Sequence, residues 1–465
     1  MPSDRIQNRT FDELAVGDAA SLTRTIGRED AVMLAALAHG LPSEEVSGTA
    51  AETGQPTYPV GYAALSAMLV PVILGTALPG PGTVYRAQSF QFTEPVHAGD
   101  SLTATLTVTE KRPADRTVVL ECAVINQERR TVLTGTAEVT APLARAAGVR
   151  ATPDLILHDH RRYEALIARA RSLPTLTAAV AHPCDDSSLE AALDAGRLGL
   201  IRPILVGKEA AIRAVAAEQH LELDGVEVVD RPDSASAAHT AVELVRTGRA
   251  QVVMKGSLHT DELMHAVTER ETGLRTTRRM SHVFILDVPT YHKPLFVTDA
   301  AVNIAPGLEE KVDILRNAIE LAHALGIALP KVAVLSAVET VTPRIPSTLD
   351  AAALCKMADR GQITGAVIDG PLAMDNAISP AAARTKRIAS PVAGDADILL
   401  CPDLEAGNIL YKELTFLLRA DVAGIVLGGR APVILTSRAD SVRSKMASCA
   451  VAVLYCHWQT RGEPT

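Results

Sequence analysis

The hydrophobic pattern of this 465-residue chain changes character near residue 145. Before that point, successive runs alternate apolar and polar residues, which is typical of strands in an antiparallel sheet. These runs lie at 83–96, 100–111, 116–128 and 131–142. A long apolar segment at 60–77 precedes them, and we expect it to form a helix that the sheet wraps. The pattern therefore predicts an α+β layer in the first part of the chain.

After residue 145, short apolar strands alternate with helical segments. The strands that we expect lie at 176–182, 202–207, 225–230, 250–256, 282–288, 331–337, 365–371, 396–402, 423–428 and 432–437. Helical periodicity fills the gaps, as in 208–219 and 308–325. This alternation predicts an α/β fold with mostly parallel sheets and helices on both faces. Ligands in such folds bind beyond the carboxyl ends of strands, so the loops there are candidate sites.

A stretch of small residues and proline at 141–154 separates the two patterns and is read as a linker. We therefore predict a first domain at 1–143, a linker at 144–156 and a second domain at 157–465. Domains usually hold roughly 100 to 200 residues, so this length allows two or three of them.

The charge balance argues against a nucleic-acid-binding protein. The 45 Lys and Arg residues against 54 Asp and Glu residues give a net charge of −9. Binding to a phosphate backbone depends on Lys and Arg, and the 3% of aromatic residues offers few stacking surfaces for bases. We expect no nucleic-acid partner.

The cysteines and the apolar segments indicate a cytoplasmic protein. The six cysteines contain no C-x-x-C pair, so neither a zinc site nor a disulfide framework is expected. The polar beginning, MPSDRIQNRTFDEL, lacks the apolar stretch of a signal peptide. The longest apolar run, 58–79, is interrupted by proline and glycine and is read as a buried helix, not a membrane span. His158 and His160 form an H-x-H pair without a further ligand nearby, so we expect a structural role and no metal.

Five motifs of the second domain agree in order with those of a known family. They are MKGSLHTDELM (254–264), TDAAVNIAP (298–306), GPLAMDNAIS (370–379), PDLEAGNILYK (402–412) and PVILTSRADSVRSKMAS (432–448). Over about residues 155–465 the chain resembles the phosphate acetyltransferase and phosphate butyryltransferase family. The resemblance implies a two-lobed fold related in outline to the isocitrate dehydrogenases. It also implies reversible transfer of a short acyl group, acetyl or else propionyl or butyryl, between coenzyme A and phosphate. Acyl-CoA, phosphate and acyl phosphate are then the partners, with coenzyme A as a substrate and no permanently bound cofactor.

The SRADS segment carries the groups that such a reaction needs. Attack of a thiolate on an acyl phosphate requires a cation at the phosphate, donors for the oxyanion and a group that makes the thiolate. Arg438 follows a strand and precedes a helix whose expected N-cap is Asp440 or Ser441, so a phosphate there meets a guanidinium and backbone N–H groups. Ser437 can donate to the sulfur or to an oxygen. Ser437, Arg438 and Asp440 are our catalytic candidates.

The identity of the base stays open. The resemblance implies an Asp seven residues after the serine, but Ser444 occupies that position, and SRADS with Asp440 resembles the butyryltransferase branch. A thiol of pKa about 8.5 is already about 3% ionised at pH 7, so the absence of a base lowers the reaction rate only about 10-fold to 100-fold. The alternative, a structural Arg and Asp pair at a helix start, is less favoured because the other motifs are in register.

Several further residues are candidates for substrate binding. Lys255 precedes Gly256, the reverse of the end of a Walker A motif, and either contacts phosphate or lies solvated at a strand end. Arg278 and Arg279 follow Arg275 closely and either clamp the phosphates of coenzyme A or solvate a helix end. The polar residues of the family-like loops either orient substrate or cap helices, with capping preferred for each: Asp299, Asn303, Asp375 and Asn408.

The first domain resembles the MaoC-like hotdog dehydratases over residues 11–142. The resemblance rests on FDELAVGD (11–18), the helix after Pro59 and LPGPGTVYRAQSFQFTEPVHAGDSL (78–102). It implies the fused pattern of an enoyl-CoA hydratase with a phosphate acetyltransferase, and pairing of copies in a homo-oligomer.

The catalytic stretch of the hydratases, G-D-x-N-P-x-H, is altered in this chain. Here it reads AHGLPSE, which places His39 at the Asp, Leu41 at the Asn and Glu44 at the His. We expect a degenerate domain. A live hydratase using His39 and Glu44 is the minority alternative. A non-catalytic assembly protein that binds coenzyme A is the third.

Overall fold

The computed structural model describes residues 5–27, 30, 33–34, 60–149, 160–437 and 440–461. The chain divides into two compact units, Met1–Leu157 and His158–Thr465, which are described one at a time. In the described ranges, no helix is long and apolar enough to cross a membrane.

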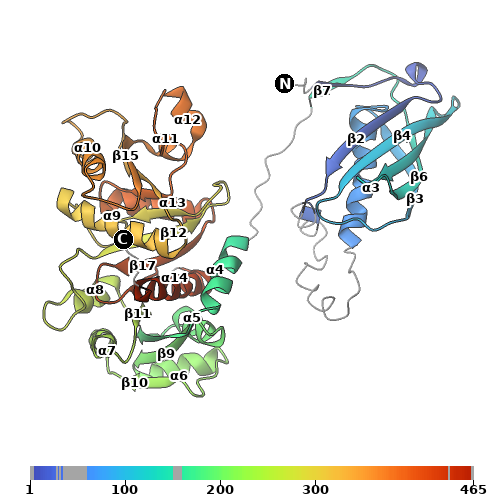
Figure 1. Cartoon of the computed structure of the whole chain (residues 1–465). Helices are drawn as coiled ribbons and strands as arrows, with labels where there is room; N and C mark the ends of the chain where they lie inside the picture. Colours follow the sequence, from blue (N-terminus) through green and yellow to red (C-terminus); the bar gives the residue numbers. More distant parts are fainter. Residues whose placement is uncertain are drawn as a thin grey trace. The chain divides into compact units, whose positions relative to one another are not determined.

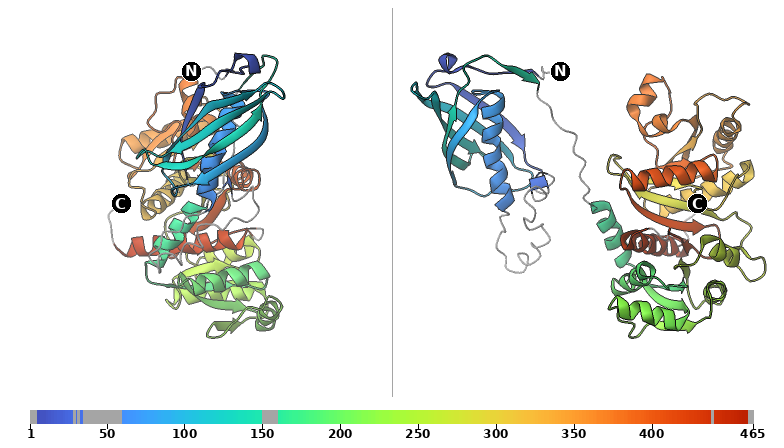
Figure 2. Two further views of the ribbon diagram at one scale, coloured as in Figure 1. Left: turned by 90° about the vertical axis from the view of Figure 1, so that its right-hand side faces the viewer. Right: turned by 180° about the vertical axis from the view of Figure 1, so that it is seen from behind.

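The first unit is a curved antiparallel sheet against a long helix, as expected (Figure 1). The sheet order is β2 (Ala19–Thr25), β4 (Ser101–Arg112), β5 (Thr117–Ile125), β6 (Thr131–Thr140) and β3 (Val84–Phe92). Helix α3 (Val60–Thr76) lies along one face of this sheet, which is plainest in the right panel of Figure 2.

Alternation along β4 explains how this unit builds its core. Leu102, Ala104, Leu106 and Val108 are buried, and the alternate residues Thr103, Thr105 and Thr107 are partly exposed, as a strand with one covered face requires. Ile73 and Leu74 of α3 belong to the same core cluster. A central helix under an antiparallel sheet is the hotdog arrangement, which confirms the fold predicted for this part.

Three short elements complete the first unit. They are a 3-10 helix at Phe11–Glu13 and the paired strands β1 (Arg5–Gln7) and β7 (Ala147–Val149). β7 lies inside the predicted linker, and its pairing with β1 places it in the first unit.

The second unit contains, within the described ranges, an eleven-stranded sheet with helices on both faces (Figures 1 and 2). Its order is β10 (Glu227–Asp230), β9 (Ile201–Gly207), β8 (Leu176–Ala181), β11 (Val252–Lys255), β18 (Val433–Ile434), β17 (Asp421–Leu427), β12 (Ser281–Asp287), β13 (Leu295–Thr298), β16 (Ile398–Leu400), β14 (Lys331–Leu335) and β15 (Val367–Leu372). The helices are α4 (Arg161–Arg171), α5 (Asp186–Arg197), α6 (Glu209–Glu218), α7 (Ser234–Arg246), α8 (Thr260–Thr268), α9 (Leu308–Ala324), α10 (Pro346–Asp359), α11 (Met374–Ile378), α12 (Pro380–Thr385), α13 (Leu404–Phe416) and α14 (Val442–Thr460).

Burial on both faces accounts for the continuous apolar strands of this unit. Along β8, Ala178 and Val180 belong to one core cluster, and Ala179 and Ala181 belong to another on the opposite face. The sheet is mostly parallel, as expected, but β12 pairs antiparallel with both β13 and β17, and β17 pairs antiparallel with β18. The sequence analysis did not include β13, a strand of four residues.

The antiparallel centre changes where the loops lie. Strands β8, β9, β10, β11 and β18 run one way, whereas β13, β14, β15 and β16 run the other way. The carboxyl ends of the two sets therefore point in opposite directions, and the candidate loops do not all emerge on the same side of the sheet. The loops after β13 and β18 start from opposite ends, but both contact His282 of β12, and both contact α13, through Asn408 and Tyr411 respectively. The candidate site lies around these contacts.

Candidate active site

Asp440 carries a half-buried carboxylate that accepts two hydrogen bonds. Its Oδ2 accepts the backbone N–H of Ser437 at 2.7 Å, and its Oδ1 accepts the hydroxyl of Tyr411 at 3.1 Å. Burial raises the pKa of Asp440, against the lowering effects of the Ser437 N–H, Tyr411 and Lys445. A carboxylate with a raised pKa is a better proton acceptor than an exposed aspartate. Asp440 thus remains the candidate base, and it lies beside the exposed Ser437.

The start of α14 leaves Asp440 available for this role. Of the two expected N-caps, Ser441 caps the helix by accepting the N–H of Ser444 at 3.2 Å. Ser444 stands where the resemblance implies an Asp, and its hydroxyl lies 3.1 Å from that of Ser441. Arg438 lies outside the described residues. The positive end of the α14 dipole lies next to this loop, so an anion is favoured there.

Lys445 also contacts this loop, and the sequence analysis missed it. Its side chain is buried, and Nζ donates to the carbonyl of Asp440 at 2.5 Å and to Oγ of Ser187 at 3.3 Å. Burial lowers the pKa of Lys445. The sequence offers only a weak signal, a lysine in the first turn of a helix whose middle is apolar.

Asp299 organises the loop that follows β13. Its Oδ1 accepts the N–H groups of Ala301 at 2.8 Å and Val302 at 3.0 Å, and its Oδ2 accepts the N–H of Asn303 at 3.2 Å. The side-chain amide of Asn303 also donates to Oδ2, at 2.6 Å. Asp299 caps no helix of the described ranges, since the next helix, α9, begins at Leu308, and its carboxylate binds the N–H groups of its own loop instead.

Asn303 and Asn408 extend the same group. Oδ1 of Asn303 accepts Nε of Arg279 at 2.6 Å, and its amide donates to the carbonyl of Met280 at 2.9 Å. Asn408, on α13, donates to the carbonyl of Ala300 at 3.0 Å. The loop after β13 is therefore fixed to both β12 and α13.

His282 joins this loop to the one that carries Asp440. It is fully buried on β12, its backbone N–H donates to Oδ2 of Asp299 at 3.3 Å, and its Nε2 donates to the carbonyl of Leu435 at 2.9 Å. Nδ1 has no hydrogen-bond partner among the described residues. Desolvation lowers the pKa of His282, which keeps the ring neutral. A single histidine inside an apolar strand was the signal that we overlooked.

The other predicted cations are already paired. Arg278 donates to Oε1 of Glu320 at 2.6 Å, and Arg279 lies 3.2 Å from Oε1 of Glu310. Both carboxylates lie on α9. Neither arginine therefore solvates a helix end, and a phosphate would have to compete with these ion pairs.

Lys255 and Asp375 have different surroundings. Lys255 is buried at the end of β11 with Nζ 3.3 Å from the carbonyl of Gly256, which contradicts its reading as a solvated lysine. Asp375 lies on α11, and its Oδ2 is 3.2 Å from Nζ of Lys386. The hydrogen bond with Lys386 lowers the pKa of Asp375. Asp375 is therefore paired with Lys386, and it makes no hydrogen bond with Asp440 in the described residues.

The histidine candidates give no metal site within the described ranges. His160 precedes α4 and its Nδ1 lies 2.5 Å from Oδ2 of Asp421. His39, Glu44 and His158 lie outside the described residues, so the hydratase alternative gains no support from the structure. In the part of the chain that is described, no cluster of three or more His, Cys, Asp or Glu side chains could hold a metal ion.

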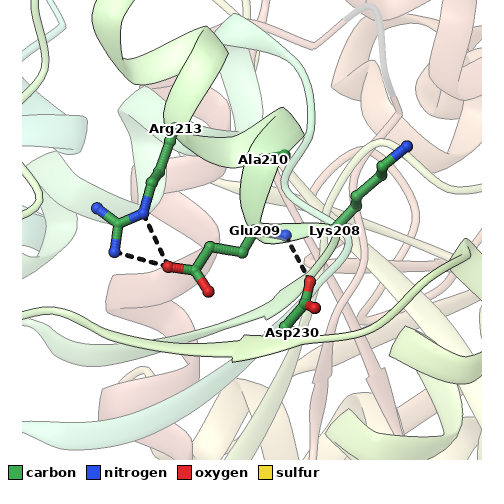
Figure 3. A pocket seen from close by; sticks show the side chains of 5 residues that line it. All are labelled: Lys208, Glu209, Ala210, Arg213 and Asp230. Carbon is green, nitrogen blue, oxygen red and sulfur yellow. Dashed lines mark hydrogen bonds and ion pairs between the residues drawn. The ribbon is translucent and has the colours of Figure 1, made fainter.

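A surface hollow lies at the carboxyl ends of β9 and β10 (Figure 3). It is lined by Lys208, Glu209, Ala210, Arg213 and Asp230. Glu209 pairs with Arg213 at 2.7 Å, and Asp230 accepts the N–H of Glu209 at 2.8 Å. Strands β8 and β11 separate this hollow from β18, so we assign it no part in the chemistry of Asp440.

Comparison with known proteins agrees with this geometry. A family model described as phosphate acetyl/butaryl transferase matches residues 234–453. The chain is 62% identical over 294 residues to a phosphate acetyltransferase from Rhizobium meliloti, covering 93% of that protein and 63% of this chain. This chain belongs to the phosphate acetyl/butaryl transferase family.

Solved structures support the fold of the family's part of the chain. A branched-chain phosphotransacylase from Enterococcus faecalis V583 is 34% identical with a TM-score of 0.54, covering 61% of this chain and 99% of that one. The phosphotransacylase fold predicted for the second domain is therefore confirmed. Its relation to the isocitrate dehydrogenases stays a prediction. The R-hydratase PhaJ1 from Pseudomonas aeruginosa is 33% identical with a TM-score of 0.31, covering 33% of this chain and 99% of that one.

A close approach between α13 and the Asp299 loop gives a testable constraint. A Cβ on Gly407 would lie 2.4 Å from the carbonyl oxygen of Asp299 and 3.0 Å from Cα of Ala300. Gly407→Ala is expected to destabilise the second unit by about 1 to 3 kcal/mol, because the backbone must shift. Denaturant unfolding measures this. The control is Gly196→Ala on α5, where the nearest atom is 3.4 Å away and no loss is expected. Equal stability of the two variants would contradict the contact.

Proposed function

We propose that this chain is a phosphate acyltransferase that moves a short acyl group between coenzyme A and inorganic phosphate. The observation that carries the proposal is the half-buried carboxylate of Asp440, held beside Ser437 at the start of α14. Family membership supports acyl transfer as the reaction. Coenzyme A takes part as a substrate, with no permanently bound cofactor.

The reaction can be written with each group in a stated role. In the direction of thioester synthesis, Asp440 takes the proton of the coenzyme A thiol, and the sulfur attacks the acyl carbon. The new C–S bond forms as the C–O bond to phosphate breaks, and phosphate leaves with that electron pair. Ser437 donates to the developing oxyanion, while Arg438 and the N–H groups at the start of α14 bind the phosphate. The reverse sequence yields acyl phosphate and the free thiol.

The remaining candidates serve binding in this proposal. Lys255, Arg278 and Arg279 supply positive charge for the phosphates of the substrates. Asp299, Asn303 and Asn408 fix the loop after β13. Asp375 is retained as a polar contact to substrate.

The acyl group is proposed to be acetyl, with propionyl and butyryl as the other candidates. Two of the similar proteins carry names with different acyl groups: an acetyltransferase and a branched-chain phosphotransacylase. Activity with each acyl-CoA must therefore be compared directly.

We also propose that the protein works in the cytoplasm as a homo-oligomer. Its six cysteines are all free thiols, as suits a reducing compartment. Large apolar side chains are exposed on α13 and just after it, namely Ile409, Phe416 and Leu417, and on β3, namely Val84 and Phe92. Exposed apolar patches commonly mark protein interfaces.

Loss of the thioester absorbance in the presence of arsenate or phosphate tests this function. Acetyl-CoA, propionyl-CoA and butyryl-CoA are compared. Arg438→Ala is expected to lower the rate roughly 100-fold to 1,000-fold, because the developing charge loses a preorganised cation. The control is Arg246→Ala, an exposed arginine on α7. No turnover with any of the three substrates would refute the proposal, and an unaffected Arg438→Ala would refute the role of that arginine.

A further inference from the structure

Tyr411 binds the carboxylate that the proposed mechanism uses as a base. Its side chain is almost fully buried on α13, and its hydroxyl donates to Oδ1 of Asp440 at 3.1 Å. Helix α13 also carries Asn408, which donates to the carbonyl of Ala300. One helix therefore contacts both loops of the candidate site.

Packing leaves the ring of Tyr411 little freedom. It stacks on Phe284 with 3.7 Å between ring centroids and 4° between the ring planes. Phe284 lies on β12, and its ring centroid is 4.1 Å from that of His282. His282 in turn donates to the carbonyl of Leu435, at the beginning of the loop that carries Asp440. The hydroxyl of Tyr411 is thus held in position by the sheet and by the loop that it serves.

We propose that Tyr411 is a positioning residue for proton transfer, whose hydroxyl orients the carboxylate of Asp440 and stabilises its ionised form. This inference rests on the proposed function, because it gives Asp440 the role of base. Tyr411 and Ser437 each occupy one acceptor site, and an ionised carboxylate has about four such sites. Electron pairs therefore remain on Asp440 to take the proton of the thiol.

The groups around Asp440 determine whether removal of the Tyr411 hydroxyl raises or lowers the pKa of Asp440. The groups that face it in the described ranges are the Ser437 N–H, the Tyr411 hydroxyl, Lys445 and the neutral ring of His282. Burial raises the pKa of Asp440, and the hydrogen bond from Tyr411 lowers it. Removal of the hydroxyl therefore raises the pKa of Asp440, and less of the carboxylate is ionised at a given pH.

Tyr411 stays a donor throughout the working range of pH. Burial raises the pKa of Tyr411 well above its usual value, and the negative charge of Asp440 adds to this effect. The phenol is therefore protonated at acid and neutral pH, where the carboxyl group of Asp440 changes its ionisation.

Tyr411→Phe tests the inference through the pH profile of kcat/KM. The acid limb is expected to move to higher pH by about one unit, the size of shift that one hydrogen bond to a charged group produces. The rate at the alkaline plateau should change little. The matched control is Tyr291→Phe, which removes another buried hydroxyl, the donor to the carbonyl of Ala396 at 2.7 Å. This control should leave the acid limb in place.

A second variant and a second readout keep the test decisive. Site-specific 3-fluorotyrosine at position 411 keeps the shape of the side chain with a more acidic hydroxyl, and should move the limb to lower pH. Difference infrared spectra, wild type minus Asp440→Asn, follow the protonated carboxyl of Asp440 without any turnover. The pH at which half of the Asp440 carboxyl is protonated should rise in Tyr411→Phe and fall with fluorotyrosine.

The two claims fail in different ways. An unchanged infrared midpoint in both variants, or an equal loss of rate at every pH, would overturn the role of Tyr411. A wild-type protein without turnover would overturn the proposed function, while the infrared titration would still decide whether Tyr411 sets the ionisation of Asp440.

Discussion

Asp440→Asn is expected to lower kcat roughly 10-fold to 100-fold at pH 7, because a thiol of pKa about 8.5 is already about 3% ionised there and partly replaces the base. The amide oxygen of the variant can still accept the N–H of Ser437, and its NH2 group can donate to the hydroxyl of Tyr411, so the loop keeps its shape, but the amide cannot take a proton. The rate of the variant should recover as the pH approaches the thiol pKa of about 8.5, because thiolate then forms without a base. Steady-state kinetics from pH 6 to pH 9 measure both effects.

Asp233→Asn is the matched control for that prediction. Asp233 also follows a strand and accepts a backbone N–H, that of Ser236 at 2.8 Å, but it caps α7. Its substitution should leave kcat unchanged. If Asp440→Asn kept a rate within threefold of the wild type across this range, another group would have to accept the proton.

Asp299→Ala is expected to destabilise the second unit by about 3 kcal/mol or more, because several buried donors lose their acceptor together. The N–H groups of Ala301, Val302 and Asn303 all converge on this carboxylate, as does the side-chain amide of Asn303. The transition of this unit in a urea titration gives the change in free energy of unfolding. Activity should fall as well, since the loop contacts α13.

Asp403→Ala provides the scale for that result. Asp403 caps α13 by accepting the N–H of Ala406 at 2.8 Å, and loss of one such cap costs about 1 kcal/mol. If Asp299→Ala cost no more than Asp403→Ala, Asp299 would be an ordinary cap and not the centre of its loop.

The periodicity of the sequence was sufficient to predict the architecture of each unit. Alternation in β4 and the apolar segment that forms α3 predicted a sheet around a helix, because one face of each strand is buried. In the second unit, continuous apolar strands between helices predicted a sheet covered on both faces. The antiparallel centre was not predictable, because strand direction depends on which distant segments pair, and β13 is too short to show a period.

The order of the motifs identified the segment from Ser437 to Asp440, but not the residues around it. Tyr411 and His282 border apolar runs and resemble core residues in the sequence, whereas Lys445 lies in the polar stretch SVRSKMAS and resembles a solvated lysine. Their partners are distant along the chain: 153 residues separate His282 from Leu435, and 258 separate Lys445 from Ser187. Such contacts exist only once the sheet has formed.

The predicted arginine clamp shows a residue group that the sequence suggested for the site but that the structure pairs with carboxylates. Arg278 and Arg279 suggested a phosphate clamp because three arginines lie within five residues. In the folded chain, Glu320 and Glu310 neutralise two of them. A charge cluster in the sequence does not reveal the carboxylates that a neighbouring helix brings to it.

Phosphorus NMR of the protein with acetyl-CoA and inorganic phosphate tests the central claim most directly. The account predicts that the acyl phosphate signal grows in a one-to-one ratio with free coenzyme A thiol, and that it disappears when coenzyme A is added in excess. Thioester loss without acyl phosphate, or at a rate independent of phosphate, would contradict it.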